Sequence, residues 1–171
     1  MTSTKFDFTF PFHSGQRDRF RNGDLIREWR HRYPQIFDDD DERVLETVHQ
    51  RQYHFFEWLT AVLIFESSGY CSLVAKYTTK SHPKKRTTLR ELITPTLYDW
   101  LCENESGQPD LFVFHPQSKD WYFCEVKGGN DRIRPNQIKW VADFAKALAR
   151  EGMSPTGRTR VTYYKKVDSS T

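Results

Sequence analysis

Residues 107–137 decide the fold and read GQPDLFVFHPQSKDWYFCEVKGGNDRIRPNQ. A short apolar run follows Asp110, and a polar segment containing a proline separates it from a second apolar run that leads through Glu125 to Lys127. Apolar runs of this length, divided by turn residues, predict two strands joined by a tight turn. Antiparallel pairing about that turn sets Asp110 opposite Glu125.

The predicted hairpin brings acidic and basic side chains together. Residues paired directly across an antiparallel ladder have Cβ atoms about 5 Å apart, so Asp110 and Glu125 would share one site. Glu125 and Lys127 are two positions apart on one strand, and their side chains therefore leave the same face. Adjacent carboxylates repel each other, but a hard divalent cation such as Mg2+ prefers oxygen ligands. A surface hairpin with solvated or mutually paired Glu125 and Lys127 is the alternative that spacing alone leaves open.

The same stretch resembles the VRR-NUC family, the virus-type replication-repair nucleases of the PD-(D/E)XK nuclease superfamily. Pro109-Asp110 matches the PD of the family, and Glu125-Val126-Lys127 matches its (D/E)XK. Residues 128–137 together with Trp140 match its pattern of glycine, DR, glutamine and tryptophan. The resemblance is densest here and extends more loosely from Glu57 to the C-terminus.

The resemblance implies a reaction and a set of roles. The reaction would be hydrolysis of DNA phosphodiester bonds that depends on Mg2+ or Mn2+, with branched or flapped DNA as the substrate. Asp110 and Glu125 would hold the metal together with the backbone carbonyl of Val126. Lys127 would position and activate the attacking water. Gln137, which shares an inward helical face with Trp140 and Phe144, would support the phosphate together with Arg132.

A third acid of the site is expected on the helix predicted over residues 40–67. Glu57 is the single charge within residues 55–65, and an ionised carboxylate in apolar surroundings is costly unless it is paired or metal-bound. The resemblance also implies a metal-associated glutamate on the helix before the first core strand. Glu46 competes for this role. The two residues would lie about 16 Å apart along one helix, so one metal site cannot use both.

Positive charges are grouped beside the predicted site. Residues 76–90 carry six Lys or Arg residues and no acid. Such a run predicts a track for a phosphate backbone, with salt-sensitive binding that does not depend on base sequence, while solvated loop charges are the alternative. The predicted nucleic-acid contacts are Lys80, Lys84, Lys85, Arg86, Arg90, Arg132 and Arg134.

The rest of the chain alternates predicted strands and helices. Further strands are predicted at residues 6–12, 71–77 and 159–165, the first as an edge strand or as an arm lying on another surface. Further helices are predicted at residues 16–32, 89–102 and 135–150, and the acidic residues 38–42 would cap the helix over residues 40–67. This order predicts an α/β fold with a mixed central sheet flanked by helices, which is the PD-(D/E)XK core that the resemblance implies.

The domain organisation follows from these elements and the resemblance. Residues 1–42 are predicted to form an N-terminal extension that holds an aromatic arm and an arginine-rich helical segment. Residues 43–171 are predicted to form the VRR-NUC-like nuclease domain. A basic loop and a helix at about residues 78–106 would be an insertion within that domain.

Composition and cysteine usage argue against disulfide-rich, zinc-binding, secreted and membrane-spanning proteins. At 171 residues the chain is long enough to bury a core as one domain, and its net charge of +3 is modest. The three cysteines are far apart without a C-x-x-C pair, which argues against a disulfide framework or a zinc site and fits a reducing compartment. The N-terminus lacks a signal-peptide pattern, and the longest apolar block is far shorter than the ~20 residues of a spanning helix. We therefore expect a cytoplasmic protein without a membrane partner.

Three functional hypotheses are compatible with the sequence. The nuclease chemistry would serve replication, repair or recombination, or it would serve an antibacterial DNA-damaging toxin that a cognate inhibitor protein neutralises. The hypothesis of a different class is a binding module without catalysis, which uses the basic segment for nucleic acid or the apolar helix for a protein. A homodimer is a further expectation, because residues 55–65 are strongly apolar.

Overall fold

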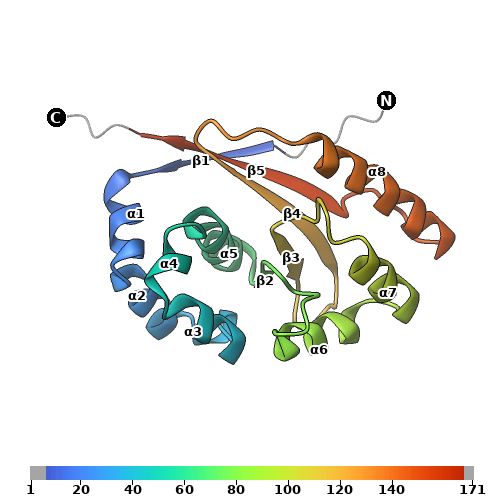
Figure 1. The fold of residues 1–171 in the computed structure, drawn as a ribbon, viewed down its shortest axis with the longest axis horizontal. Helices are drawn as coiled ribbons and strands as arrows, with labels where there is room; N and C mark the ends of the chain where they lie inside the picture. The colour runs from blue at the N-terminus through green and yellow to red at the C-terminus, as the bar shows by residue number, and fades with distance from the viewer. Residues whose placement is uncertain (1–6, 168–171) are drawn as a thin grey trace.

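The computed structural model describes residues 7–167, which form a five-stranded mixed sheet with helices on both faces (Figure 1). The strand order is β1-β5-β4-β3-β2. Neighbours are antiparallel from β2 to β4, whereas β5 runs parallel to β4 and β1 runs parallel to β5. The strands are β1 (Asp7–Phe12), β2 (Cys71–Val74), β3 (Leu111–Phe114), β4 (Trp121–Gly128) and β5 (Thr159–Lys166). The predicted α/β fold is confirmed.

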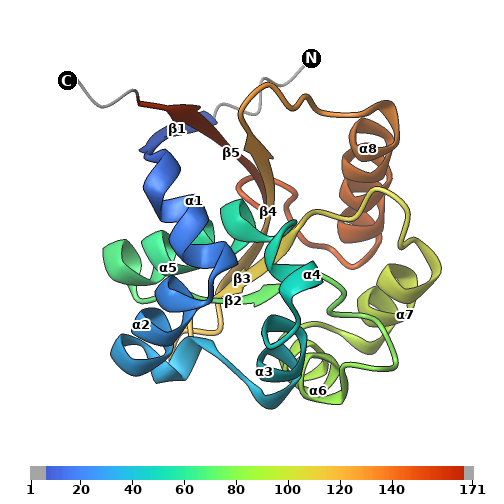
Figure 2. The same cartoon turned by 60° about the vertical axis from the view of Figure 1, so that its left-hand side comes forward.

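The helices form two groups, one on each side of the sheet (Figures 1 and 2). The first group is α1 (Ser14–Arg21), α2 (Asp24–Arg32), the 3-10 turn η1 (Pro34–Ile36), α3 (Asp39–Leu45), α4 (Val48–Arg51) and α5 (Phe55–Ser68). The second group is α6 (Pro83–Leu92), α7 (Pro95–Glu103) and α8 (Pro135–Arg150). No helix within residues 7–167 combines the length and the apolar character that crossing a membrane requires.

Alternation along β4 connects the two cores of the protein. Tyr122 and Cys124 belong to the core packed against α5, whereas Trp121 and Phe123 belong to the core packed against α7 and α8. Successive side chains of a strand point to opposite faces, so Glu125 and Lys127 continue the α8 side toward the end of β4. The strand therefore carries aromatic residues at one end and charged residues at the other.

The register of the hairpin agrees with the prediction. Leu111 pairs with Cys124, and extending this register by one residue sets Asp110 opposite Glu125. The tight turn is closed by the amide of His115, which donates to the carbonyl oxygen of Asp120 at 2.8 Å. The last predicted strand also lies beside the hairpin, because β5 pairs with β4.

The single helix predicted over residues 40–67 is wrong, because the structure divides this segment into α3, α4 and α5. Arg51 accounts for the interruption. Its guanidinium donates to the carbonyl oxygens of Leu45 and Glu46 at the end of α3 and to that of Arg21. These carbonyls therefore need no amide from a following helical turn. The predicted end is correct, since Gly69 terminates α5 with a φ of 73°.

The segment predicted as a basic loop followed by one helix also differs. Pro83 begins α6, so Thr87 and Thr88, which precede the helix predicted from residue 89, lie inside a helix. Pro95 does not kink a continuous helix but begins α7, where the Thr94 side chain accepts the amide of Leu97. Proline is favoured at a first helical position because the amide that it lacks has no helical partner there.

The N-terminal segment is part of the sheet and of the core on the α5 side. Of the predicted strand at residues 6–12, Phe6 lies outside the described residues, and the remainder is the edge strand β1 beside β5. The arginine-rich segment is two helices, separated at Gly23 with a φ of 85°. Phe20 of α1 packs against Trp29 of α2 and Phe55 of α5. The boundary at residue 42 stays a prediction.

The apolar half of α5 is used within the chain itself. Phe55, Trp58 and Val62 are buried in the core between α5 and the sheet. The apolar character on which the homodimer expectation rests is therefore explained by intramolecular packing, and the dimer itself stays a prediction.

The acidic residues before and within α3 do more than cap a helix. Asp38 caps α3 by accepting the amide of Asp41, as predicted. Asp40 accepts the amides of Lys84 and Lys85 at the start of α6. Asp41 lies 2.6 Å from the Lys85 ammonium, and both side chains are 4% exposed. Burial raises the pKa of the Asp41 carboxyl to about 6, although the charge of Lys85 acts in the opposite direction.

The Asp41–Lys85 ion pair predicts a structural role for Lys85 that can be measured. Lys85→Met leaves a buried carboxylate without its partner, and it should lower the free energy of unfolding by roughly 3–5 kcal/mol at neutral pH. A carboxyl with a raised pKa keeps its proton longer in the folded state, so its burial costs stability as the pH rises above its unfolded pKa. Without Lys85 that pKa rises further. Urea denaturation should therefore show a larger deficit at pH 8 than at pH 5.

Lys84→Met is the matched control, since the neighbouring Lys84 is exposed and should leave the unfolding midpoint unchanged. Equal stability of the two variants would contradict the structural role of Lys85.

Candidate active site

Asp110 is held in place from three directions. Its carboxylate oxygen Oδ2 accepts the amide of Val126 on β4 at 2.8 Å. Its carbonyl oxygen accepts the amide of Ala75, just after β2, also at 2.8 Å. The preceding carbonyl, of Pro109, accepts the hydroxyl of Tyr77 at 2.8 Å. The loop that carries Asp110 is therefore bonded to the strands or strand ends on both of its sides.

Glu125 is 6% exposed, and its two carboxylate oxygens have different surroundings. Oε1 accepts the side-chain amide of Gln137 at 2.5 Å and lies 2.7 Å from the ammonium of Lys127. Oε2 is buried, and no N–H or hydroxyl group of residues 7–167 donates a hydrogen bond to it. Burying a carboxylate oxygen without a hydrogen-bond donor costs free energy of folding. A bound ligand at Oε2 would offset this cost.

The acids of the site influence one another. Burial raises the pKa of Asp110 well above its ordinary value, and the negative charges of Glu125 and Glu57 raise it further. Glu57 thus acts on Asp110 from the first turn of α5, where its Oε1 lies 3.4 Å from His54 Nδ1. Glu46 is exposed at the end of α3. It does not share a helix with Glu57, because the chain leaves the helical conformation between α3 and α5. Of the two candidate glutamates, Glu57 is the one beside Asp110.

The donor set at this place fits a hard divalent cation. Mg2+ and Mn2+ take oxygen ligands, and carboxylates are common among them. Asp110 and Glu125 supply two converging carboxylates, and Oε2 of Glu125 receives no hydrogen bond from residues 7–167. Within residues 7–167 no three Asp, Glu, His or Cys side chains form a ready-made metal cage. Mg2+ usually keeps several waters and needs only one or two carboxylates, so this limited set is sufficient.

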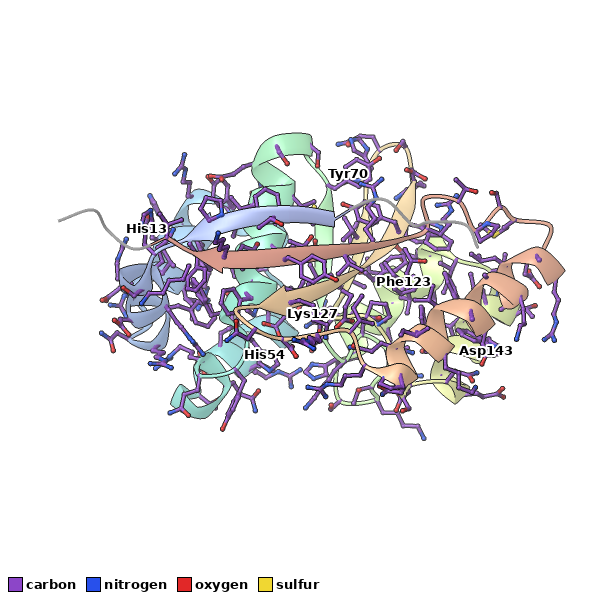
Figure 3. The ribbon with its side chains drawn as sticks, turned by 90° about the horizontal axis from the view of Figure 1, so that it is seen from above. His13, His54, Tyr70, Phe123, Lys127 and Asp143 are labelled. Atoms are coloured by element: carbon purple, nitrogen blue, oxygen red, sulfur yellow. The ribbon has the colours of Figure 1, made fainter. Side chains whose placement is uncertain are left out.

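Lys127 lies on the same face of β4 as Glu125, on the side of the sheet where α8 runs (Figure 3). Its side chain is 3% exposed, and its ammonium lies 3.7 Å from Asp131 in addition to its contact with Glu125. Burial of an ammonium is tolerated when carboxylates compensate its charge. The lysine is therefore fixed beside the two acids, as the strand alternation predicts.

Gln137 joins the start of α8 to the site. Its carbonyl oxygen accepts the amide of Arg134 at 2.9 Å, and its NH2 group donates to Glu125. The side chain thus caps the start of α8 and also points inward, as the shared face with Trp140 predicts. The approach of α8 requires Gly107, because a Cβ there would come within 2.5 Å of the Asn136 carbonyl oxygen. Gly107 also has a φ of 87°, which favours glycine.

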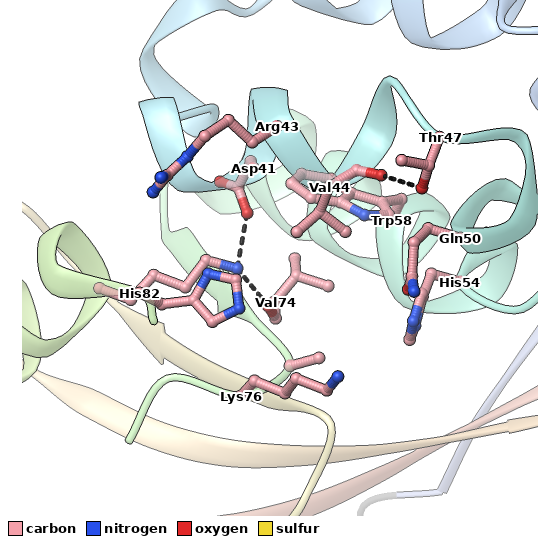
Figure 4. Close-up of a pocket in the computed structure, with 12 residues that line it drawn as sticks. Asp41, Arg43, Val44, Thr47, Gln50, His54, Trp58, Val74, Lys76 and His82 are labelled. Carbon is pink, nitrogen blue, oxygen red and sulfur yellow. Dashed lines mark hydrogen bonds and ion pairs between the residues drawn. The ribbon is translucent and has the colours of Figure 1, made fainter. Parts of the chain in front are cut away.

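Two hollows reach the acids, and another is lined by His54, the neighbour of Glu57. A cavity of about 260 Å3 lies between α3, α5, the end of β2 and α6, and it is lined by Lys76, His54 and His82 among others (Figure 4). A wider depression of about 410 Å3 reaches Asp110 and also includes Lys76. A third hollow, of about 170 Å3, includes Glu125 and Gln137. Asp110 and Glu125 are therefore each reached by one concave surface.

The predicted nucleic-acid contacts divide into exposed and internal residues. Lys85 is a correction, because its ammonium is buried between Asp41 and the carbonyl oxygen of Val74. Arg86 is partly buried and donates to the hydroxyl of Tyr98. The exposed residues of the set are Lys80, Lys84, Arg90, Arg132 and Arg134.

Sequence reasoning missed two residues near the site. Tyr77 is 1% exposed, and burial raises its pKa well above its ordinary value, so its hydroxyl remains a donor to Pro109. No spacing rule connects a tyrosine to a carbonyl so distant in the chain. Lys76 lies within the basic run but is not among the predicted DNA-binding residues. Its backbone φ of 47°, like that of Ala75, turns the chain at the end of β2 and brings the lysine beside two of the hollows.

Comparisons with known proteins identify a family that this chain matches. The VRR-NUC domain model matches residues 41–154. The Fanconi-associated nuclease 1 homolog of Pseudomonas aeruginosa is 42% identical over 38 residues, which cover 22% of this chain and 7% of that protein. Fanconi-associated nuclease 1 of Homo sapiens is 45% identical over 40 residues, which cover 23% of this chain and 4% of that protein. The chain thus matches only a small part of the length of either relative.

A crystal structure of paFAN1 bound to a 5′-flap DNA with a gap aligns with a TM-score of 0.31 and 23% identity, over 71% of this chain and 24% of that one. The family match, by contrast, spans more than half of the chain and includes Asp110, Glu125 and Lys127. On that match, the chain belongs to the VRR-NUC family.

Proposed function

We propose that the chain is a Mg2+- or Mn2+-dependent deoxyribonuclease that hydrolyses phosphodiester bonds in branched, flapped or junction DNA, in the service of replication, repair or recombination. The observation that carries the proposal is the unpartnered, buried Oε2 of Glu125 beside an Asp110 whose pKa is raised by burial and by neighbouring acids. A cation removes both costs at once. Family membership and the exposed lysines and arginines supply the rest of the support.

The residues that would hold the metal are Asp110, Glu125 and the carbonyl of Val126, with Glu57 acting directly or through water. When bound, the cation would stabilise negative charge on the phosphate that is attacked. Gln137 and Lys127 both bind Oε1 of Glu125, so they fix the rotation of the carboxylate and leave Oε2 for the ligand. The carboxylate is thereby oriented before substrate arrives.

Lys127 has the role of positioning the attacking water. Its ammonium has three donors, and one of them is directed at Glu125. Asp131 lies 3.7 Å from the same ammonium, which is too far for a hydrogen bond, so a further donor can bind a water or a phosphate oxygen at the metal site. Because the side chain is almost fully buried, its charge acts with little solvent screening on the group that it contacts.

The exposed cations point to recognition of the DNA backbone. Lys80 and Lys84 precede or begin α6, and Arg132 and Arg134 lie in the loop before α8. In the sequence, the two pairs flank the segment that contains Asp110, Glu125 and Lys127. Such residues neutralise phosphates and read no base sequence. Since paFAN1 has been crystallised with a flap DNA, a flapped substrate is the first one to test.

Substitutions at the site should separate catalysis from folding. Lys127→Ala and Asp110→Ala should each lower the rate of cleavage of a 5′-flap duplex by at least roughly a hundredfold, because a preorganised charge is lost at the reacting phosphate. Cleavage of labelled flap, junction and linear duplexes, with Mg2+, Mn2+ or chelator, measures this. Lys146→Ala on the exposed side of α8 is the matched control. Wild-type rates for Lys127→Ala in metal would refute the assignment.

The exposed lysines should act on binding rather than on chemistry. Lys80→Met with Lys84→Met should weaken binding of all duplexes in chelator and reduce the dependence of log Kd on log salt by up to about 0.9 for each phosphate that the lysines no longer neutralise. Fluorescence anisotropy at several salt concentrations measures the slope. A slope identical to that of the Lys146→Ala control would show that these lysines do not bind phosphates.

A further inference from the structure

The hollow of about 170 Å3 beside Glu125 differs from the other two in its lining. Most of its wall is aliphatic and comes from Pro109, Ile133, Ile138, Val141 and Val161. These residues belong to the loop before β3, the loop before α8, the first turns of α8 and the beginning of β5. Segments far apart in the sequence thus gather apolar side chains at one place, directly beside the proposed catalytic carboxylate.

Ile138 is the most unusual residue of this wall. It is 61% exposed and is one of three large hydrophobic residues that lie exposed in the described part of the chain. Ile138 and Val141 are three residues apart on α8 and therefore share a helical face. Ile133, Val141 and Val161 are only partly buried, so the exposed isoleucine continues into a concave apolar surface. A single exposed isoleucine needs no explanation, but one at the mouth of an apolar hollow does.

The charges around the hollow limit what it can receive. Arg132 and Arg134 are exposed on the loop that contributes Ile133, and Glu125 is the single acid of the lining. An apolar group that carries negative charge on its outer side suits this arrangement. A nucleotide has that form, since a base, whose flat aromatic faces pack on apolar side chains, is attached to an anionic phosphate. Apolar side chains such as isoleucine and proline are also the type that enters between bases and unstacks them.

We propose that this hollow receives one unpaired nucleobase of the DNA, next to the phosphate that is cleaved. The proposal rests on the proposed nuclease function, and it adds a physical reason for a preference for branched DNA. A base in a duplex must be unpaired and unstacked before it can enter, whereas a base at a flap or junction enters at a lower free-energy cost. Ile138 is then the side chain on which the base rests, and Val141 and Val161 form the floor.

A fluorescent base tests the proposal without cleavage. The probe is a 5′-flap duplex that carries 2-aminopurine at the unpaired position next to the branch, and a second duplex carries it at a paired position. Stacking on other bases quenches this fluorophore, so transfer among aliphatic side chains should raise its emission. Titration with the full chain in chelator, and again with Ca2+, should raise the emission of the unpaired probe only. Anisotropy of a separate end label reports binding of the DNA itself.

Substitutions in the wall of the hollow test whether the emission change arises from a base bound there. Ile138→Ala, at an exposed position, and Val141→Trp, which fills the hollow, should abolish the emission change and lower the preference for flapped over linear DNA roughly tenfold, the effect expected when one base no longer rests on a side chain. Val167→Ala is the matched control, because Val167 is an aliphatic residue that is 40% exposed beyond the end of β5. It should retain both the signal and the preference.

The contrary outcomes are distinct. DNA cleavage without an emission change, or an emission change that persists in Ile138→Ala, would overturn the base site and leave the nuclease function standing. An emission change without cleavage in any metal would overturn the nuclease function and leave the base site standing. A change of mass in solution on Ile138→Ala, from dimer to monomer, would show instead that the hollow binds a second copy of the chain.

Discussion

Crowding of two buried carboxyls, those of Asp110 and Glu125, is the constraint on which the site depends. Burial and the neighbouring acids raise the pKa of Asp110, while no N–H or hydroxyl group of residues 7–167 donates to Oε2 of Glu125. Folding tolerates this arrangement because the rest of each residue is firmly bound. Val126 and Ala75 hold Asp110, and Lys127 and Gln137 hold Glu125. The structure thus concentrates unfavourable charge at one place. The surrounding hydrogen bonds keep the two carboxyls from moving apart. Both features are common in catalytic sites.

The elements around the site have separate tasks. The two aromatic cores fix β4 in the middle of the sheet, so that its charged end is presented at a rigid edge. Gly107 allows α8 to approach the loop that carries Asp110, and the first turn of α8 then supplies both a bond to Glu125 and the exposed Ile138. On the other side, Asp41 and Lys85 join α3 to α6. Catalysis, binding of the DNA backbone and binding of a base are therefore proposed for different residues near the same few helix ends.

The sequence predicts the hairpin well because strand alternation and turn residues act over short distances. The pairing of Asp110 with Glu125 and the shared face of Glu125 and Lys127 follow from period and register alone. The internal role of Lys85 does not follow, because its partner Asp41 comes from a distant helix and a basic run looks the same whether its members are solvated or buried. The interruption of the helix at residues 46–54 is equally hidden, since it depends on Arg51 reaching carbonyls of α3 and α1. Tertiary contacts between distant residues decide such cases.

The central claim is that the two crowded carboxyls form the binding site of a divalent cation. Titration of the metal-free protein with Mn2+, followed by electron paramagnetic resonance of the free ion, tests this claim directly and independently of any nuclease activity. The account predicts a single bound Mn2+ per chain, lost in Asp110→Asn and in Glu125→Gln and retained in Glu46→Gln, whose carboxylate lies at an exposed helix end. Absence of binding by the wild-type chain, or equal binding by Glu125→Gln, would contradict it.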